Sequence, residues 1–277
     1  MPDRIIVVDN DPDKSAEPVV LSFINKLPVI YISEQKQGTP CARNAAIGIC
    51  KTALLGFVDD DCTLDPHWTT SGLNALRNKK ITYTIGKSLL YNTKNLIALT
   101  QHIHYSYWLS RKLKQSFPFS PPMKFDTKNV IIRTNALRKY RLIFNKHYTI
   151  NTVDSSDTDM GFRLDRKNRK GIFVPQMIVA HEESENLCRF LYKSYHRGRL
   201  AYRLAQQWDL WDELVCLPHK NWLTYIKSIR YWPKEYAEYM TENRQPPIIK
   251  ITIFLLIKVL ERAYLEGYLH EMSISEK

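Results

Sequence analysis

Short apolar runs, separated by polar turns and by an Ala-rich segment, dominate the start of the chain. Residues 4–9 (RIIVVD) and 29–32 are continuous apolar runs, a pattern typical of parallel strands that are buried on both faces. Residues 40–53 have a helical spacing with Pro40 near the first turn, and residues 54–58 form another strand pattern that ends in acids. This order predicts an α/β fold with a doubly wound, mostly parallel sheet flanked by helices.

The rest of the chain adds further strand and helix patterns. Strands are predicted at residues 83–90, 130–133 and 173–180, and helices at residues 66–76, 95–115 and 157–164. Residues 116–125 contain three prolines and predict a loop. From residue 187 to residue 272 the pattern is helical, basic and aromatic.

Composition excludes several classes of chain. Hydrophobic residues make up 44% and charged residues 25%, with only 9 Gly and 14 Pro, which excludes a disordered, collagenous or low-complexity chain. A chain of 277 residues can bury a sizeable core without a disulfide or a structural metal. The 5 cysteines are odd in number and form no close CxxC pair, which argues against a disulfide scaffold or zinc ribbon and favours a reducing cytosol.

The chain is strongly basic. Its 40 Lys and Arg against 28 Asp and Glu give a formal net charge of +12, which attracts nucleic acid, an anionic membrane face or phosphorylated substrates. The first residues are acidic and do not resemble a signal peptide. The longest apolar stretch, residues 248–260, contains Lys250 and Lys258 and is shorter than the roughly 20 residues that span a bilayer.

An acidic triplet, Asp59-Asp60-Asp61, follows the predicted strand at 54–58. Its carboxylates would lie at the carboxyl end of that strand, where open α/β sheets bind ligands. Adjacent carboxylates repel one another, and a divalent cation that also binds phosphates would relieve the repulsion. A solvated acidic turn that caps the next helix explains the triplet equally well, so the triplet alone leaves both interpretations open.

Other polar segments have ordinary structural explanations when each is taken alone. Residues 37–44 (QGTPCARN) are a glycine turn before a helix, where Arg43 could contact a diphosphate or a base edge. Asp157 and Asp159 lie at a predicted helix start, where capping and the helix dipole favour carboxylates and where a general base is the functional alternative. His181 follows a predicted strand and is either a buried core histidine or a ligand of metal or phosphate.

Taken together and in this order, these segments resemble the family 2 glycosyltransferases, which have the GT-A fold. The matching phrases, which cover residues from about 4 to 205, are IIVVDN, QGTPCARNAAI, LLGFVDDDCTLDPHW, NVIIRTNAL, SSDTDMGFRLDRKNRKGIFVPQMIVAHE and YHRGRLAYRL. The resemblance implies transfer of a sugar from a nucleoside diphosphate donor, of which a UDP-sugar is the first candidate. The fully processive synthases carry a QxxRW phrase that is absent from this sequence, which favours transfer of a single sugar.

The resemblance implies a nucleotide-binding set. The aspartate that ends the early strand, here Asp9, contacts the base in that family. The glycine and ARN segment helps to hold the nucleotide, which indicates Gly38, Arg43 and Asn44. Basic residues in the YHRGR phrase reach the diphosphate, and they correspond here to Arg197 and Arg199.

The resemblance also implies a metal site. The DxD-type cluster contacts the ribose and holds Mg²⁺ or Mn²⁺ on the diphosphate. Asp59 and Asp60 would lie near the ribose and the metal, and Asp61 is the expected direct ligand. His181 corresponds to the family's histidine near the diphosphate and metal.

The general base comes from an acid pair in that family, usually Glu-Asp. The aligned residues here are Ser156 and Asp157, so Asp157 is the expected base for removing the proton of the acceptor hydroxyl. Direct attack on the anomeric carbon would then invert its configuration. Asp154 and Asp159 are close enough in sequence to be mistaken for the base, and Asp159 is expected to support the helix start or an acceptor contact.

Family members usually begin with an additional strand and helix before the strand at IIVVDN. This sequence begins at that strand, so we expect a chain that lacks the usual first strand, which lines the nucleotide pocket. We divide the chain into a nucleotide-sugar-binding half (residues 1–112), an acceptor and catalytic half (residues 113–186) and a helical region (residues 187–277). In that helical region, residues 222–239 are aromatic and basic, and residues 248–269 are apolar with scattered basic residues. This pattern suits either packing on the catalytic domain or contact with an anionic membrane face.

The sequence therefore predicts a metal-assisted inverting glycosyltransferase that acts on a glycan or lipid-linked acceptor. The predicted location is the cytoplasm, with peripheral contact on the cytoplasmic face of a membrane. A nucleotidyltransferase with a similar sheet and a truncated, inactive relative are the alternatives. Nucleic acid is not an expected partner, because a phosphate backbone avoids a cluster of unfilled carboxylates.

Overall fold

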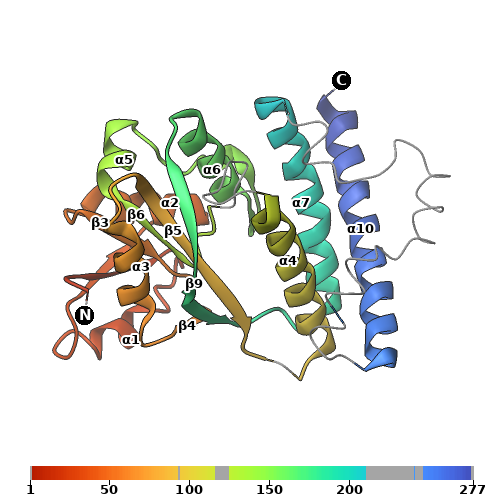
Figure 1. Cartoon of the computed structure of the whole chain (residues 1–277), viewed down its shortest axis with the longest axis horizontal. Coiled ribbons are helices and arrows are strands. Elements are labelled where there is room, and N and C mark those ends of the chain that lie inside the picture. Colours follow the sequence, from red (N-terminus) through yellow and green to blue (C-terminus); the bar gives the residue numbers. More distant parts are fainter. Residues whose placement is uncertain (1, 93, 116–124, 210–239, 241–245, 276–277) are drawn as a thin grey trace. The chain divides into compact units, whose positions relative to one another are not determined.

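The computed structural model describes residues 2–92, 94–115, 125–209, 240 and 246–275. The chain divides into two compact units, one formed by Met1–Ser88 and Ser116–Ala180 and the other by Leu89–Gln115 and His181–Lys277. The first unit is a mixed α/β structure, whereas the described elements of the second are chiefly helices (Figure 1).

The chain begins with a parallel pair of strands in the first unit. Strand β1 (Ile5–Asp9) pairs with β2 (Val29–Ser33), with Ile5 opposite Val29 and Asp9 opposite Ser33. Helix α1 (Glu17–Leu21) connects the two strands, and helix α2 (Thr39–Ile49) follows β2. The strands predicted at residues 4–9 and 29–32 are confirmed.

A five-stranded sheet forms the centre of the first unit. Its strand order is β3-β6-β5-β9-β4, for β3 (Leu54–Phe57), β6 (Val130–Arg133), β5 (Ile81–Leu90), β9 (Lys170–His181) and β4 (Cys62–Leu64). Strand β6 runs antiparallel to both β3 and β5. The prediction of a mostly parallel sheet therefore needs correction around β6, because an apolar run as short as residues 130–132 can pair in either direction.

Helices cover this sheet and complete the first unit. They are α3 (Trp68–Leu76), α5 (Thr134–Lys139) and α6 (Ser156–Arg166), with a 3₁₀ turn at Lys146–Tyr148 and the short strands β7 (Thr149–Ile150) and β8 (Val153–Asp154) before α6. Trp68 and Leu76 of α3 pack in one apolar cluster with Ile131 of β6 and Met177 of β9. One part of the core of this unit thus lies between α3 and the sheet.

Helix α2 is shorter than the helix predicted at residues 40–53. Cys50 has an extended backbone, with φ −63° and ψ 117°, so the helix ends at Ile49. The hydroxyl group of Thr52 then donates to the carbonyl of Leu54, which is the first residue of β3. Local side-chain bonds of this kind compete with the helix, and the spacing of apolar residues does not reveal them.

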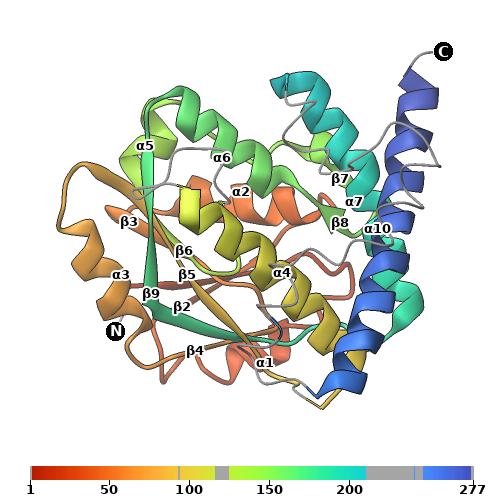
Figure 2. The ribbon, with the colours of Figure 1, turned by 45° about the vertical axis from the view of Figure 1, so that its right-hand side comes forward.

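The second unit contains the helices α4 (Leu96–Gln115), α7 (Leu187–Trp208) and α10 (Pro247–Ser275). Helices α7 and α10 lie side by side in both ribbon views (Figures 1 and 2). Their backbones approach closely at two glycines: a Cβ atom added to Gly198 would lie 1.9 Å from the carbonyl oxygen of Tyr264, and one added to Gly267 would lie 1.8 Å from that of Tyr195. Only glycine permits this approach.

Two predicted segments fall largely or wholly outside the described residues. They are the proline-rich loop at 116–125, of which only Phe125 is described, and the aromatic and basic segment at 222–239. Among the helices of the described ranges, none is both long and apolar enough to cross a membrane.

Candidate active site

An arginine joins two acidic turns of the first unit. The Arg43 side chain on α2 bonds through Nη2 to Asp59 Oδ1 at 3.2 Å and through Nη1 to Asp154 Oδ2 at 2.7 Å. Asp59 follows β3 and Asp154 ends β8, so residues that are 95 positions apart share one guanidinium group. The structure thus brings the predicted Asp59 and Arg43 together with the turn that precedes Asp157.

Asp157 lies in the first turn of α6, where its carboxylate is half-buried. Burial, together with the nearby carboxylates of Asp154 and Asp126, raises its pKa to about 7, against the opposing effects of Arg43 and the Thr158 N–H. The Thr158 N–H donates to Asp157 Oδ1 at 2.6 Å. A carboxyl group that titrates near neutral pH can accept and release a proton during a reaction.

Asp154 differs from Asp157 in how its carboxylate is held. Its oxygens accept hydrogen bonds from the Ser156 N–H at 2.9 Å, the Ser156 hydroxyl at 2.9 Å and the Thr149 hydroxyl at 3.0 Å, besides the bond from Arg43. These bonds hold the Asp154 carboxylate in place at the entry of α6. Ser156, which replaces the acid usual at this position, is one of the groups that hold it.

Two charged residues of this site were not predicted from the sequence. Asp126 raises the pKa of both Asp59 and Asp157, so its carboxylate lies within electrostatic reach of both. Lys128, whose Nζ is 3.9 Å from Asp126 Oδ2, lowers the pKa of Asp59. The next residue, Asn129, is fully buried and donates to the carbonyls of Lys87 and Met177. The available signal was a polar Asp-Thr-Lys-Asn run directly before a buried strand.

The acidic triplet has the charge distribution of a cation site. Burial and the carboxylates of Asp126 and Asp61 raise the pKa of Asp59, against the opposing effects of Arg43 and Lys128. Asp60 and Asp61 are exposed on the turn after β3. Carboxylate oxygens are ligands that Mg²⁺ and Mn²⁺ prefer, and a cation would relieve the mutual repulsion of these groups. The residues of this turn therefore fit the predicted metal.

Two further ligand types are present near the ends of strands. Cys62 is the first residue of β4, and burial together with the charge of Asp61 raises the pKa of its thiol to about 12, which keeps the sulfur protonated. His181 is the last residue of β9 and the first residue of the second unit, and its Nδ1 lies 3.1 Å from Glu183 Oε1. Asp61, Cys62 and His181 offer a carboxylate, a thiol and an imidazole as ligand atoms.

Asp9 is engaged in holding its own loop. Its buried carboxylate accepts from the N–H groups of Asp11 and Ala16 and from the Tyr31 hydroxyl, each at 3.0 Å. The last of these bonds joins β1 to β2, and burial together with the charge of Asp9 raises the pKa of Tyr31 to about 12. The predicted contact of Asp9 with a nucleotide base remains a prediction.

Gly38 and Asn44 are likewise held by the first unit. Gly38 has φ 119°, a backbone conformation that side chains disfavour, and its N–H donates to Asn10 Oδ1 at 2.8 Å. The Asn44 amide donates to the carbonyl of Phe144 at 2.9 Å and accepts from the Phe144 N–H at 2.7 Å. Both ends of the Asn44 side chain therefore fix α2 against the segment that precedes Lys146–Tyr148.

The remaining predicted residues lie on helices. Asp159 is buried and pairs with Arg163 one turn later, with Arg163 Nη2 at 2.7 Å from Asp159 Oδ2, which supports its expected role at the start of α6. In the second unit, Arg197 is exposed, whereas Arg199 Nε bonds to Glu271 Oε2 of α10 at 2.6 Å. Arg199 thus ties α7 to α10, and its contact with a diphosphate remains a prediction.

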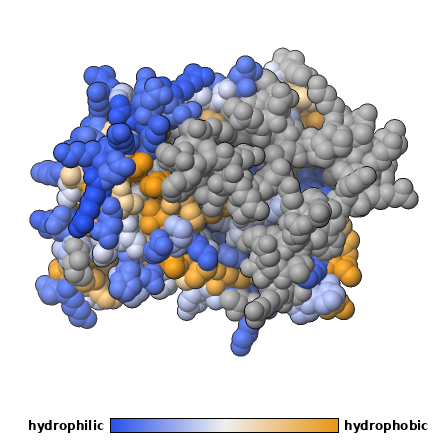
Figure 3. All heavy atoms as spheres, in the orientation of Figure 1, coloured by the Kyte–Doolittle hydropathy of each residue, from blue (hydrophilic) through white to orange (hydrophobic). Residues whose placement is uncertain are grey.

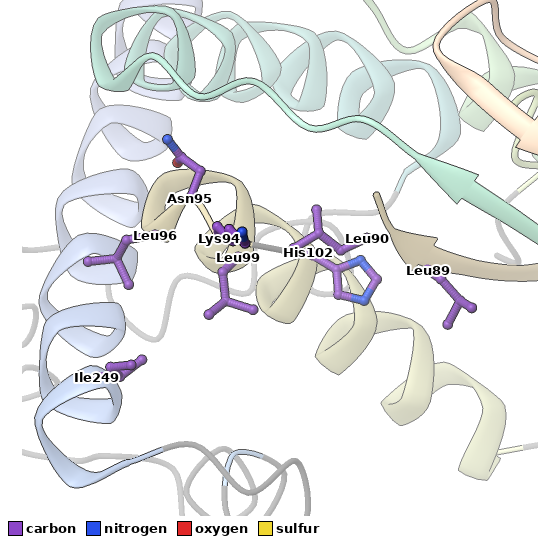
Figure 4. Close-up of a pocket in the computed structure, with 8 residues that line it drawn as sticks. All are labelled: Leu89, Leu90, Lys94, Asn95, Leu96, Leu99, His102 and Ile249. Carbon is purple, nitrogen blue, oxygen red and sulfur yellow. The ribbon is translucent and has the colours of Figure 1, made fainter. Parts of the chain in front are cut away.

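A cavity of about 640 Å³ lies in the second unit (Figure 4). Its lining is mostly aliphatic and consists of Leu89, Leu90, Lys94, Asn95, Leu96, Leu99, His102 and Ile249. The side chain of Asn95 caps α4, because its Oδ1 accepts from the N–H of Ile97 at 2.8 Å. None of the residues predicted for the active site lines this cavity.

The mixed sheet and its covering helices place the chain in a class, the α/β proteins of the GT-A fold. The family profile described as Glycosyl transferase family 2 matches residues 1–143, which is about half of the chain. The chain belongs to this family. The matched residues include Asp9, Arg43 and the acidic triplet, whereas Asp157 lies beyond them.

Two kinds of relative agree with this assignment. The pre-mycofactocin glycosyltransferase of Mycobacterium tuberculosis is 25% identical over 207 residues, which cover 73% of this chain; the chain spans only 42% of that relative's length. Glucosyl-3-phosphoglycerate synthase of M. tuberculosis, solved with phosphoglyceric acid, superposes with a TM-score of 0.51 at 12% identity, over 76% of this chain and 71% of that one. TarS residues 1–349 of S. aureus in complex with UDP gives a TM-score of 0.51 at 12% identity, over 100% of this chain and 84% of that one. These structures confirm the predicted fold.

Proposed function

We propose that this chain transfers a single sugar from a nucleoside diphosphate sugar to a hydroxyl group of a glycan or lipid-linked acceptor, with inversion at the anomeric carbon. A UDP-sugar is the first donor to test, because TarS, which has a similar fold, was solved with UDP. The observation that carries the proposal is the contrast between two neighbouring carboxylates. The Asp154 carboxylate accepts bonds from the N–H and hydroxyl groups of Ser156, whereas burial and the nearby carboxylates of Asp154 and Asp126 raise the pKa of Asp157 to about 7.

Asp157 is the proposed general base. Its carboxylate takes the proton of the acceptor hydroxyl, the acceptor oxygen forms a bond to the anomeric carbon, and the bond between that carbon and the diphosphate oxygen breaks. The bonding electrons leave with the nucleoside diphosphate. A single displacement of this kind inverts the anomeric configuration, and a base with a pKa near the working pH is best suited to the proton transfer.

A divalent cation, Mg²⁺ or Mn²⁺, is the proposed cofactor. Asp61 would hold it together with Asp59 and His181, and Asp60 would lie near the ribose. When bound, the cation neutralises the charge that develops on the leaving diphosphate. Burial raises the pKa of Asp59, and the carboxylates of Asp126 and Asp61 add to this effect; the gathering of carboxylates here supports this part of the proposal.

A lipid-linked acceptor is the acceptor class we favour. Five of the eight residues that line the cavity of the second unit are leucine or isoleucine, with Lys94 and His102 as the titratable groups. Sugar hydroxyl groups need polar partners, and an aliphatic lining offers few of them. The aliphatic lining would instead suit the hydrocarbon tail of an anionic lipid, and the ammonium group of Lys94 would suit its phosphate.

Transfer can be tested with the full chain, Mn²⁺ and UDP-glucose, UDP-galactose or UDP-N-acetylglucosamine as donors, with octyl glucoside and a prenyl-diphosphate-linked sugar as acceptors, because both offer a sugar hydroxyl. We expect release of UDP that depends on the acceptor, and a product whose anomeric configuration by NMR is opposite to that of the donor. Retention of configuration would contradict the single displacement. Release of pyrophosphate from a nucleoside triphosphate, without sugar transfer, would favour the nucleotidyltransferase.

Peripheral contact with the cytoplasmic face of a membrane is the second part of the proposal. Ile248, Ile251, Leu255 and Val259 of α10 are between 49% and 74% exposed, and their spacing places them on one face of the helix. Figure 3 shows apolar surface at the lower right edge, where Figure 1 draws the first half of α10. An exposed apolar stripe on a chain with a formal net charge of +12 suits an anionic lipid surface.

The membrane proposal predicts sedimentation of the chain with vesicles of phosphatidylglycerol and phosphatidylcholine, and less with phosphatidylcholine alone. The double variant Ile251→Gln/Leu255→Gln should bind the mixed vesicles about tenfold more weakly, because two apolar side chains lose their burial. Leu73→Gln, which changes an exposed leucine of α3 in the first unit, is the matched control. Equal binding by the double variant and the control would contradict a membrane role for the stripe.

A further inference from the structure

The Arg43 guanidinium group is enclosed by protein groups. Its side chain is 14% exposed, and it bonds to the half-buried Asp59 and to the Asp154 side chain, which is 10% exposed. The ring of Phe144 completes the enclosure, with the guanidinium carbon 5.5 Å from the ring centroid. Both terminal nitrogens of Arg43 therefore already have carboxylate partners inside the first unit.

One of these partners leads directly to the proposed base. Asp154 accepts from the N–H and hydroxyl groups of Ser156, the first residue of α6, and Asp157 is the next residue. The Thr149 hydroxyl holds the same carboxylate from β7. A chain of bonds thus runs from Arg43 through Asp154 to the first turn of α6.

The charged groups around Asp157 include both Arg43 and Asp154, the two residues that begin this series of bonds. The groups that act on the Asp157 carboxyl are Asp154 from β8, Asp126 from the segment before β6, and Arg43 from α2. Arg43 is the cation among them, so it offsets two carboxylates that would otherwise disfavour a charged Asp157.

We infer that Arg43 is a positioning residue for Asp157 that acts through Asp154, and that it is not a contact of the nucleotide. The inference rests on the proposed function for the role of Asp157, and it replaces the role that the family resemblance implies for Arg43. Without its arginine, Asp154 would lose one of its anchors, and the first turn of α6 would lose its fixed position relative to α2.

A double-mutant cycle tests this inference. We expect Arg43→Gln and Asp154→Asn each to lower kcat by about 100-fold, since a small displacement of a catalytic group costs about this much. The kcat of the double variant should be at most about threefold below that of the slower single variant, because both changes break the same series of hydrogen bonds. The Kd for UDP should change by less than about threefold in Arg43→Gln. Arg169→Gln is the matched control, since Arg169 also lies over an aromatic ring, that of Tyr140.

The pH dependence gives a second measurement that a purely structural role would not move. In Arg43→Gln, the acidic limb of the kcat profile should shift to higher pH by about one unit. In the double variant, the limb should return towards its original position, because a carboxylate is removed together with the cation. Additive losses of kcat, an unmoved limb and a tenfold or larger increase in Kd would overturn the inference and show a nucleotide contact.

The same shift can be followed without any substrate. Carbon-13 NMR titration of the aspartate carboxyl groups, with Asp157→Asn to assign the signal, reports the pKa of Asp157 directly. An upward shift of this pKa in Arg43→Gln is expected even if the chain transfers no sugar. A chain that transfers no sugar but shows this shift would contradict the proposed function and support the inference. A chain that transfers sugar without the shift would contradict the inference alone.

Discussion

Asp157→Asn is expected to lower kcat for sugar transfer by about 1,000-fold, while the Kd for UDP changes by less than about threefold. An amide cannot take the proton of the acceptor hydroxyl, and general base catalysis contributes about 10²–10⁴-fold to a rate. The change keeps the shape of the side chain, and its amide oxygen can still accept from the Thr158 N–H. Asp165→Asn on the same helix is the control and should keep nearly full activity.

The same variant should be more stable than the original chain at alkaline pH. Folding raises the pKa of Asp157 from 3.8 to about 7, so the folded state holds this proton more tightly than the unfolded state. The stability from this group is therefore complete below about pH 4 and is lost as pH rises through about 7. We expect Asp157→Asn to melt several degrees higher than the original chain at pH 8 and at the same temperature at pH 4. Full activity, or lower stability at pH 8, would argue against a catalytic Asp157.

Asp61→Ala is expected to weaken binding of UDP in the presence of Mn²⁺ by about 100-fold and to remove the dependence of binding on the metal. Loss of a direct carboxylate ligand leaves the cation with weaker partners, and even outer partners of metal sites are worth about 10–100-fold in affinity. Because Asp61 is exposed on the turn after β3, we expect the variant to fold as the original chain does.

Calorimetry of UDP, GDP and dTDP with and without Mn²⁺ measures this effect and identifies the base. Asp13→Ala, which removes another exposed aspartate of the same unit, is the control and should bind as the original chain does. Metal-dependent binding that persists in Asp61→Ala would remove Asp61 from the metal site. Absence of binding by the original chain to all three nucleotides would favour the inactive relative.

The family and the order of the longer elements could be predicted from the sequence, whereas α1, α5 and the short strands β4, β7 and β8 were not predicted. The short apolar runs that begin at Ile5, Val29, Leu54 and Val130 form β1, β2, β3 and β6. They could be recognised because a strand that is buried on both faces consists of consecutive apolar residues. The acidic triplet and Asp157 were recognisable because short phrases in a fixed order surround them.

The environment of each acid could not be predicted in this way. Asp154 and Asp157 are equal in type and three positions apart, yet the Asp154 carboxylate is held by bonds from Ser156 and Thr149, whereas burial and neighbouring carboxylates raise the pKa of Asp157 to about 7. Asp126 and Lys128 reach the site from a segment without a motif, because the pairing of β6 with β3 and β5 carries them there.

The sequence by itself determined the longer strands, the acidic triplet and the family, because apolar periodicity and local phrases are properties of neighbouring residues. The tertiary structure alone decided the antiparallel direction of β6, the enclosure of Arg43 and the different surroundings of Asp154 and Asp157. These depend on contacts between residues up to 111 positions apart in the chain. The free energy of a carboxylate is set by the charges, donors and water around it, and only the folded chain brings those together.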